Sequence, residues 1–499
     1  MITVHSFKTH GIEAVPVNVE VEITAGIGIH LVGLANEAVK DCLLRTFTAM
    51  DAAACHVPGH KMIINIAPAD LRKDCTGLDL PIALGIIAET AQQPLPDIDG
   101  YVIAGELALD GSVREVPGWL QCALVAKESG KACILPTKSA MYAARVLGES
   151  VPIYGVDSLR EAMDLIQNGA QRTAYQAAVE AGYTREPDRS LNGWDGIKGF
   201  EGEKRAVEIA AAGGHPLMFV GELGMPEKLS RALRDILPPL SEKEVLESQG
   251  VVSVLNGYRH PRQRPFSDPH HSEPLPSIFG SGDPVRPGEV SRAHGGVLYL
   301  HNCLNFQTPV IERICLAMAA RSVTFPRLRG TYTYPASFQL VTSMKPCLCG
   351  RYGHAEECRC TAKERKTYLN QMNPLLYERL TVQAFCHAAQ PDAAPGEPFE
   401  VVAERVKAAR ERQMERQGKL NDELSIGEAI QALSNDAEQT QELDVFASDL
   451  IERMRLSVRA YSRILRIART IADLAGEDNV STAHIAEAAS YRFLDKVEA

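Results

Sequence analysis

Residues 217–224 read Leu-Met-Phe-Val-Gly-Glu-Leu-Gly, an apolar run that leads into a turn with two glycines. An apolar strand followed by a glycine turn is how a phosphate-binding loop begins. Such a loop continues to Gly-Lys-Ser/Thr, whereas this chain continues Met225-Pro226-Glu227-Lys228-Leu229-Ser230. The stretch therefore predicts the framework of an ATPase in which the residues that hold the phosphates are altered.

A second apolar run, Val297–Leu300, is followed by His301-Asn302, where an ATPase has Asp-Glu. The Asp would hold the water shell of Mg²⁺, and the Glu would polarise the attacking water. Histidine is neutral or positive near pH 7, and an asparagine amide takes up no proton. Neither replaces a hard carboxylate on Mg²⁺, so binding of ATP and Mg²⁺ is doubtful on the sequence alone.

The bulk composition is that of a soluble globular protein with more than one domain. The chain has 499 residues, of which 45% are hydrophobic and 23% charged, with a net charge of -11. Two to four domains are expected at this length. The negative charge argues against attraction of the whole surface to nucleic acid or an anionic membrane. No apolar run approaches a bilayer span and no secretory signal is evident, so we expect a cytoplasmic protein without membrane contact.

Composition divides the chain into four parts. Residues 1–168 alternate strand-like and helix-like runs, which predicts an α/β domain. Residues 169–192 are polar and are predicted to be a linker. In residues 193–392 strands alternate with helices, which indicates a largely parallel sheet. Residues 393–499 are helical by pattern, with one long run at 447–474 and a closing segment that begins after the N-cap Ser481.

Ordered motifs along nearly the whole chain resemble one known family, the magnesium-chelatase-like AAA+ ATPases of the ComM (YifB) type. The N-terminal part resembles that family's Lon-protease-like domain, the middle part its AAA+ core, and the last part its helical lid. The motifs are Asn65-Ile-Ala-Pro-Ala-Asp70, Ala210-Ala-Ala-Gly-Gly-His215, Ile236-Leu-Pro-Pro-Leu-Ser241, Arg286-Pro-Gly-Glu-Val-Ser-Arg-Ala-His294, Pro346-Cys-Leu-Cys-Gly350 and Leu456-Ser-Val-Arg-Ala-Tyr-Ser-Arg463.

The resemblance implies a cytoplasmic ATPase that assembles into a hexameric ring, and its competence members are DNA helicases that promote branch migration. A Lon-type protease needs a serine nucleophile and a lysine base. The segments 77–81 and 117–121, where the resemblance places these two residues, contain neither. We therefore expect no protease activity.

Within the resemblance, the nucleotide motifs are degenerate at several independent places. Gly221 and Gly224 are retained, but Lys228 lies one place too far along, and Ser230 would have to shift to reach Mg²⁺. Pro226 also lacks the N–H that a phosphate-binding turn would offer. These four positions, two glycines, a lysine and a serine, are at most a remnant of a nucleotide site.

Four further positions bear on catalysis in the family. Lys345 stands where the family has a sensor asparagine, and Glu378 stands where it has the arginine finger. Arg459 and Arg463 match the family's sensor-two region, although a salt bridge within the lid is the more ordinary interpretation of both. Loss of a finger alone lowers turnover by about 10³–10⁵. We therefore expect no ordinary ATP hydrolysis.

Four of the twelve cysteines form a cluster, Cys347-x-Cys349 and Cys358-x-Cys360. Four thiolates suit a tetrahedral zinc ion, and the family carries cysteines at the same places. His354 is a possible substitute ligand, and a set of reduced surface thiols is the plainer alternative. The other eight cysteines are single within apolar stretches and are expected to be buried and reduced.

Two functional hypotheses remain open at this stage. The first is a catalytically degenerate scaffold or regulator linked to DNA uptake or recombination, as a homo-oligomer or together with an active paralogue. The alternative is an active ATP-dependent helicase of the ComM type with unusual loops. Basic residues within 405–416 and 453–469 leave DNA binding possible, but a solvated helix face explains them as well.

Overall fold

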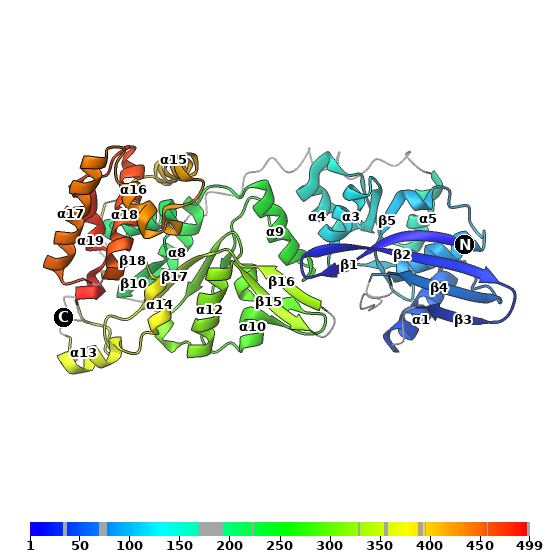
Figure 1. Ribbon diagram of the computed structural model, residues 1–499. Helices are drawn as coiled ribbons and strands as arrows, with labels where there is room; N and C mark the ends of the chain where they lie inside the picture. The colour runs from blue at the N-terminus through cyan, green and yellow to red at the C-terminus, as the bar shows by residue number, and fades with distance from the viewer. Residues whose placement is uncertain are drawn as a thin grey trace.

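A computed structural model gives the fold of this chain. It describes residues 1–32, 37–68, 77–168, 193–221, 224–327, 330–353, 358–387, 393–394, 396–456 and 458–496. An N-terminal α/β unit, a central sheet with its helices and a group of C-terminal helices follow one another along the molecule (Figure 1). Within these ranges no helix is both long enough and apolar enough to cross a membrane.

In the described part of the N-terminal unit, seven strands form one mixed sheet in the order β3-β4-β2-β1-β5-β8-β9. Its strands are β1 (Ile2–His10), β2 (Glu13–Thr24), β3 (Gly28–Val32), β4 (Lys61–Ala67), β5 (Tyr101–Ile103), β8 (Ala132–Pro136) and β9 (Ile153–Val156). The helices are α1 (Glu37–Ala52), α2 (Asp79–Glu89), α3 (Trp119–Glu128), α4 (Thr137–Leu147) and α5 (Leu159–Asn168), and the short strands β6 (Glu106–Leu107) and β7 (Val113–Arg114) pair beside them.

Helices cover both faces of this sheet because successive strand residues point to opposite sides. On β5, Val102 packs into the core beneath α3 and α4, while the next residue, Ile103, packs into the core beneath α2 and α5. The strands and helices expected from periodicity in this region are therefore present, and the α/β prediction is confirmed.

The central sheet is parallel and, in the described residues, contains five strands in the order β11-β14-β17-β10-β18. The strands are β10 (Leu217–Gly221), β11 (Phe266–Ser267), β14 (Val297–Leu300), β17 (Gln339–Met344) and β18 (Val382–Cys386). Two-stranded ribbons project beside it, β12 (Gly280–Ser281) with β13 (Arg286–Pro287) and β15 (Ser322–Arg327) with β16 (Gly330–Pro335). The helices are α7 (Glu201–Gly213), α8 (Gly224–Ile236), α9 (Glu242–Ser253), α10 (Leu275–Phe279), α11 (Glu289–Arg292), α12 (Thr308–Ala320), α13 (Ala362–Leu369) and α14 (Pro374–Arg379).

The C-terminal part is helical, as predicted. The prediction of one long helical run at 447–474 is wrong. The helices are α15 (Phe399–Gln417), α16 (Ile426–Gln431), α17 (Ala437–Met454), α18 (Val458–Ala475) and α19 (Thr482–Ser490). Arg455 adopts φ +54°, and the Leu456 amide bonds back to the Ile451 carbonyl at 3.0 Å. A hydrogen bond of this kind closes a helix at its C-terminus. Helix α17 therefore ends here, although the helical pattern of the sequence continues. Ser481 caps α19 as expected.

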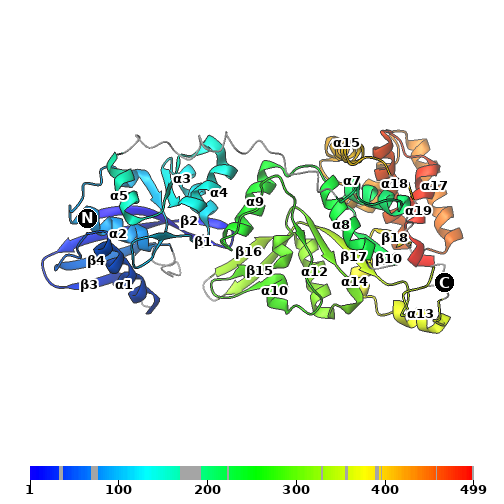
Figure 2. The same cartoon turned by 180° about the vertical axis from the view of Figure 1, so that it is seen from behind.

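Helix α9 joins the central part to the N-terminal unit, with β1 and α3 close beside it (Figure 2). The Ser253 carbonyl accepts from the Gly118 amide at 2.9 Å, and the Ser253 hydroxyl accepts from the Leu120 amide at 3.0 Å. The rings of Tyr142 and Tyr258 stack with centroids 4.4 Å apart across the same boundary. Buried polar contacts of this kind fix the orientation of the two parts.

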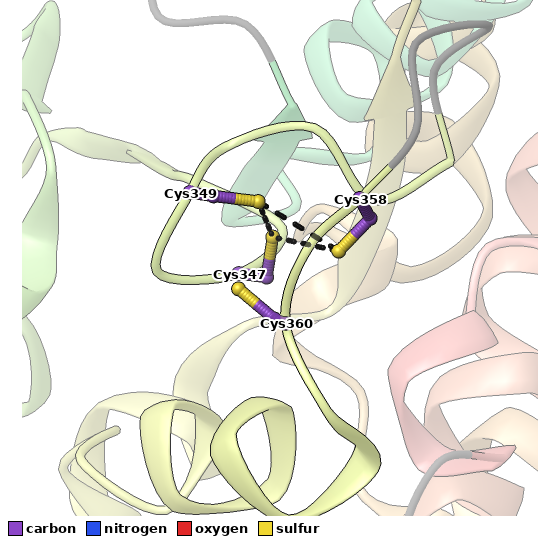
Figure 3. A group of neighbouring side chains, drawn as sticks. All are labelled: Cys347, Cys349, Cys358 and Cys360. Carbon is purple, nitrogen blue, oxygen red and sulfur yellow. Dashed lines mark hydrogen bonds between the residues drawn. The ribbon is translucent and has the colours of Figure 1, made fainter.

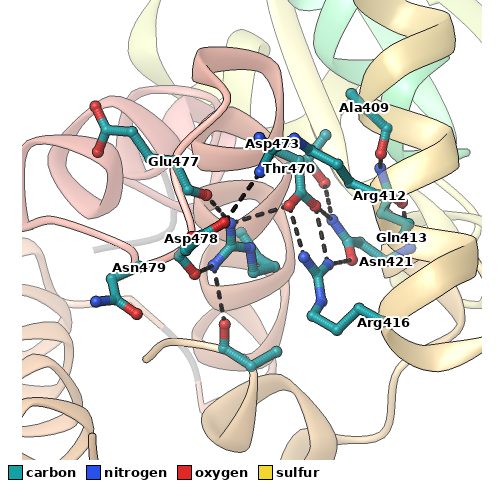
Figure 4. A network of polar contacts seen from close by, with 12 residues as sticks. Ala409, Arg412, Gln413, Arg416, Asn421, Thr470, Asp473, Glu477, Asp478 and Asn479 are labelled. Atoms are coloured by element: carbon teal, nitrogen blue, oxygen red, sulfur yellow. Dashed lines mark hydrogen bonds and ion pairs between the residues drawn. The ribbon is translucent and has the colours of Figure 1, made fainter. Parts of the chain in front are cut away.

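A buried ion network holds the C-terminal helices together around Asp473 (Figure 4). Asp473 is fully buried and accepts two hydrogen bonds from Arg416, at 2.7 and 2.9 Å. Arg469 donates to the same carboxylate at 2.9 Å, and the Asn421 amide donates at 2.9 Å. Every lone-pair direction of the carboxylate is thus occupied by a donor from α15, η6 (Asn421–Glu423) or α18.

We predict that Asp473→Asn lowers the free energy of unfolding by about 3–5 kcal/mol, because it leaves two arginines without their buried counter-charge. Urea unfolding followed by circular dichroism measures the change. Asp478→Asn is the matched control, since its side chain is 81% exposed and forms a surface ion pair with Arg412. We expect the control to change stability by less than about 1 kcal/mol. Equal effects of the two substitutions would contradict the role assigned to Asp473.

Candidate functional site

The altered nucleotide motifs lie at one edge of the central sheet. In parallel strands the carboxyl ends meet at the same edge. The register pairs Val220 with Met344 and Leu300 with Thr342, so the residues that follow β10, β14 and β17 emerge side by side. The structure therefore brings together Gly221, His301 and Lys345, as the sequence motifs require.

Gly221 is required by the packing of this sheet. It has φ +153°, and a Cβ at this position would lie 2.1 Å from the Cys386 carbonyl oxygen on β18. A side chain has no room there. In contrast, a Cβ on Gly224, the first residue of α8, would meet nothing within 4 Å. The close approach of two strands is thus sufficient reason for a glycine at 221, whether or not a phosphate binds.

Lys228 and Ser230 lie well inside helix α8 and away from its N-terminus. At 1.5 Å per residue they are about 6 and 9 Å along the axis from Gly224. The Ser230 hydroxyl is buried and donates to the Pro226 carbonyl at 2.6 Å, within its own helix. Lys228 is exposed to solvent. In this arrangement neither side chain occupies the position that a phosphate-binding loop gives to its Lys and Ser/Thr.

Acidic groups lie beside the N-terminus of α8, where phosphates would bind. Glu227 forms an ion pair with Arg231 at 3.0 Å, and the Arg231 guanidinium lies over the Phe266 ring at 4.4 Å. Asp268 follows β11, and its pKa is raised above the usual value by burial and by the charge of Glu227. Sequence analysis did not find Asp268, because its place depends on the pairing of β11 with β14. Two neighbouring carboxylates disfavour a triphosphate at this end of the helix.

His301 and Asn302 are held by a small polar cluster instead of facing a metal. The Tyr299 hydroxyl lies 2.9 Å from Ser343 Oγ and 3.4 Å from His301 Nδ1. The Asn302 amide donates to Ser343 Oγ at 3.1 Å, and Asn302 adopts φ +51°. Burial raises the pKa of Tyr299, so this phenol stays protonated. These contacts connect β14 to β17 through neutral hydrogen bonds.

Glu378 and Arg463 meet at the boundary between the core and the C-terminal helices. Glu378 lies on α14, and its backbone carbonyl accepts a hydrogen bond from Arg463 Nη2 of α18. Only 8% of Arg463 is exposed, and burial, together with Arg492, lowers its pKa to about 10. The guanidinium remains charged at neutral pH. Arg459 belongs to α18, but its side chain lies outside the described residues.

The four clustered cysteines come together in space (Figure 3). The Sγ atoms of Cys347, Cys349, Cys358 and Cys360 all lie within 4.8 Å of one another. The Cys347–Cys349, Cys347–Cys358 and Cys349–Cys358 sulfur distances are 3.3, 3.7 and 3.7 Å. A tetrahedron with metal–sulfur bonds of about 2.3 Å has sulfur–sulfur edges of about 3.8 Å. The cluster is therefore compatible with zinc. His354 lies outside the described residues.

Backbone amides favour the thiolate form at this cluster. The amide of Arg351 donates to Cys349, and this hydrogen bond, followed by that from the Cys347 thiol, lowers the pKa of Cys349 to about 6. A thiolate is the form that binds a metal. Seven further cysteines in the described residues are buried, as expected, and Cys75 lies outside those residues.

In the N-terminal unit, residues 77–81 and 117–121 are the segments compared with a protease site. Their side chains make contacts that stabilise the fold. Asp79 is buried and accepts from Cys42 Sγ at 2.7 Å and from the Leu107 amide at 3.2 Å, and it pairs with Arg45 at 3.1 Å. Gln121 donates to the Ile12 carbonyl at 3.0 Å. These side chains tie α2 and α3 to their surroundings, and the segments carry no serine–lysine pair.

Comparisons with known proteins agree with this architecture over the whole chain. A family model for the magnesium chelatase subunit ChlI matches residues 194–393, a second model for subunit ChlI matches 19–139, and a model for the ChlI C-terminal part matches 396–492. The protein YifB of Escherichia coli is 34% identical over 99% of this chain and 97% of its own length. Competence protein ComM of Haemophilus influenzae is 32% identical over 98% of this chain and 97% of its own. A Mycobacterium tuberculosis protein is 30% identical over the same shares.

We predict that Gly221→Ala lowers the free energy of unfolding by about 3 kcal/mol or more, because its Cβ would overlap the Cys386 carbonyl. Gly224→Ala is the control, for which we expect unchanged or slightly higher stability, since alanine is the better helix former and meets no atom there. Denaturant titration of both variants gives the comparison. A Gly221→Ala protein as stable as the wild type would show that the glycine is not required by the sheet.

Proposed function

This chain belongs to the family of the magnesium chelatase subunit ChlI, together with YifB and ComM, and we propose that it is a member that does not hydrolyse ATP. In this proposal the chain keeps the ATPase fold and acts as a scaffold or regulator. The observation that carries it is the position of Ser230, whose hydroxyl is used inside helix α8 at 2.6 Å from the Pro226 carbonyl. Helix α8 has no other hydroxyl side chain that could ligate Mg²⁺ in its place.

The other altered positions support the same proposal. His301 and Asn302 belong to a hydrogen-bonded cluster with Tyr299 and Ser343, and Glu378 replaces the finger arginine of the family. Glu227 and Asp268 add negative charge near the place of the phosphates. Each change affects a different part of the machinery for phosphoryl transfer. Gly221 and Gly224 are then a structural remnant of a nucleotide site.

The proposed parts are a Lon-protease-like domain at 1–168, a linker at 169–192, an AAA+ core at 193–392 and a helical lid at 393–499. The places of the three family-model matches support these boundaries. The family's AAA+ character supports an oligomer, either a homo-oligomeric ring or a mixed ring with an active paralogue. The name of the Haemophilus influenzae relative, competence protein, supports a connection to DNA uptake or recombination.

We propose that the four-cysteine cluster holds one structural zinc ion. Cys347, Cys349, Cys358 and Cys360 would be the ligands, and zinc would fix the loop between β17 and α13. Four thiolates leave no open coordination position, which is typical of structural and not catalytic zinc. The ion would therefore support the fold without taking part in a reaction.

We predict that the purified protein shows no Mg²⁺-dependent ATP hydrolysis above background, at least about 10³-fold below an active relative such as ComM assayed in parallel. Phosphate release with and without Mg²⁺ measures this. Titration with a fluorescent ATP analogue to high micromolar concentration is expected to show no saturable binding. Hydrolysis that Lys228→Ala abolishes would overturn the proposal and favour an active helicase of the ComM type.

We predict one zinc ion per chain, and a loss of more than nine-tenths of it in Cys349→Ser. Serine is a poor zinc ligand, so three thiolates would be left with an incomplete site. Elemental analysis after desalting measures the metal. Cys315→Ala removes a buried thiol elsewhere and is expected to keep the full zinc content. Absence of zinc from the wild-type protein, or equal loss in both variants, would contradict the site.

A further inference from the structure

A cavity of about 540 Å³ opens at the edge of the central sheet opposite the altered nucleotide motifs. It is lined by residues that precede three of the strands, Pro216 before β10, Gly296 before β14 and Phe338 before β17. In a parallel sheet the amino ends of the strands meet at one edge, and the carboxyl ends, here with Gly221 and His301, meet at the other. The cavity is therefore separate from the candidate nucleotide site. Its volume lies within the roughly 300–1,000 Å³ of pockets that hold small molecules.

The C-terminal helices form another side of this cavity. Arg410 of α15 lines it, together with Leu420, Asp422 and Glu423 at η6. The central part contributes α9 and, near the end of α12, Met318. The cavity thus lies between the central part and the C-terminal helices, where one bound molecule would contact both.

The carboxylates nearest to Arg410 already have partners. Glu244 accepts from the Ser241 amide at 2.8 Å in the capping box of α9, and it pairs with Arg264 at 3.6 Å. Glu423 pairs with Arg321 at 2.7 Å. The charges of Glu244 and Glu423 act on Arg410, but neither carboxylate forms an ion pair with it.

The other two carboxylates of the cavity bond elsewhere as well. The Ser337 amide donates to Nδ1 of the buried His294 at 3.1 Å, so the proton of this imidazole is on Nε2, which donates to Glu247 at 3.0 Å. Burial lowers the pKa of His294, in keeping with this neutral form. Asp422 accepts from the Thr381 hydroxyl at 2.8 Å. Both carboxylates are thus occupied by donors other than Arg410.

Arg410 has no carboxylate partner among the residues that the structure describes. Its Nε donates to the Ala211 carbonyl at 2.8 Å, and its terminal nitrogens, Nη1 and Nη2, form no hydrogen bond with another described residue. Burial, followed by the charge of Arg264, lowers the pKa of Arg410 to about 9, so the guanidinium is still charged at neutral pH. A cation held away from water without a counter-charge is costly, and an anion bound at the two free nitrogens would offset this cost.

Apolar side chains line much of the remaining wall. Three of them, Met318, Phe338 and Leu420, are only partly buried in the protein. A ligand with an apolar body would remove this surface from water, which is favourable in proportion to the area covered. The cavity therefore combines one unpaired cation with an apolar wall.

We propose that this cavity binds a small carboxylic acid with an apolar body. The carboxylate accepts from Arg410 Nη1 and Nη2, and the body packs against Met318 and Phe338. A guanidinium matches a planar carboxylate with two parallel hydrogen bonds. A phosphate monoester carries close to two negative charges and is disfavoured by the nearby charges of Glu244 and Glu423. This site goes beyond the proposed function, and binding there needs no ATP.

The test is a ligand-observed NMR titration of the full-length protein with 3-phenylpropionate, without nucleotide. For a ligand of about eleven non-hydrogen atoms we expect a Kd of about 1 mM. The uncharged 3-phenylpropan-1-ol has the same apolar body and is expected to bind at least about tenfold more weakly. Arg410→Gln should weaken binding of the acid at least about tenfold and leave binding of the alcohol unchanged. Phe338→Ala should weaken binding of both compounds by a similar factor, because they share the apolar body.

Arg412→Gln is the matched control. Arg412 lies two residues further along α15, its side chain is 41% exposed, and it pairs with Asp478 at 3.1 Å. The control should bind the acid within about twofold of the wild type, since surface ion pairs contribute little. Equal losses in Arg410→Gln and Arg412→Gln would overturn the proposal.

Three results with the wild-type protein would also overturn it, and none depends on the folding of a variant. They are equal affinity for the acid and the alcohol, tighter binding of phenyl phosphate than of the acid, and no saturable binding of the acid up to about 10 mM. Because ATP is absent from every sample, these results are independent of the hydrolysis assay.

Discussion

The pairing of β10 between β17 and β18 is the constraint on which the candidate site depends. Together with the pairing of β14 and β17, it brings the strand ends to one edge, so that Gly221, His301 and Lys345, which are 44 to 124 positions apart along the chain, lie at the ends of neighbouring strands. The same pairing places the Cys386 carbonyl against Gly221 and so excludes a side chain there. Sheet formation thus fixes the geometry of a nucleotide site even where the groups that would act on a nucleotide are absent.

What the sheet requires and what a nucleotide requires are therefore different. This difference explains why the fold is kept while the motifs for ATP are altered. Gly221 is needed by the backbone of the neighbouring strand, and a phosphate ligand is not required to explain it. The residues that only a nucleotide would require are the ones that have taken other roles. Ser230 closes a hydrogen bond within its own helix, Glu227 pairs with Arg231, and Asn302 bonds to Ser343. The Ser230 hydroxyl and the Glu227 carboxylate each have a partner within α8, so substitution there costs the fold little, whereas the side-chain oxygen of Asn302 is buried without a hydrogen-bond partner.

Much of the fold and of the candidate site could be predicted from the sequence, and the features that could not be predicted have physical reasons. The strands at 217–221 and 297–300 follow from local pattern and were predicted. The cysteine cluster was predicted from spacing together with the resemblance, and the structure brings its sulfurs together.

Features that depend on tertiary contacts could not be predicted from local sequence pattern. Asp268 joins the site only through the pairing of β11 with β14, which leaves no local signal in the sequence. The break between α17 and α18 was also missed. There Arg455, a good helix former, adopts a left-handed conformation while Ile451 packs into the core. Tertiary packing overrides helix propensity at this position.

The contact between Arg463 and the Glu378 carbonyl shows how the lid can be positioned without a nucleotide. In the family the corresponding lid region senses the bound nucleotide, whereas here Arg463 is nearly buried and bonded to the protein backbone. The neighbouring Asp495 accepts from both Arg492 of the lid and Tyr377 of α14, so a second polar contact joins the same two parts. Water is largely excluded from these bonds, which makes each costly to break unless a new partner is supplied. A ligand that moved the lid would have to replace both contacts. In this arrangement, contacts within the protein hold the core and the C-terminal helices together, and no nucleotide is needed for them.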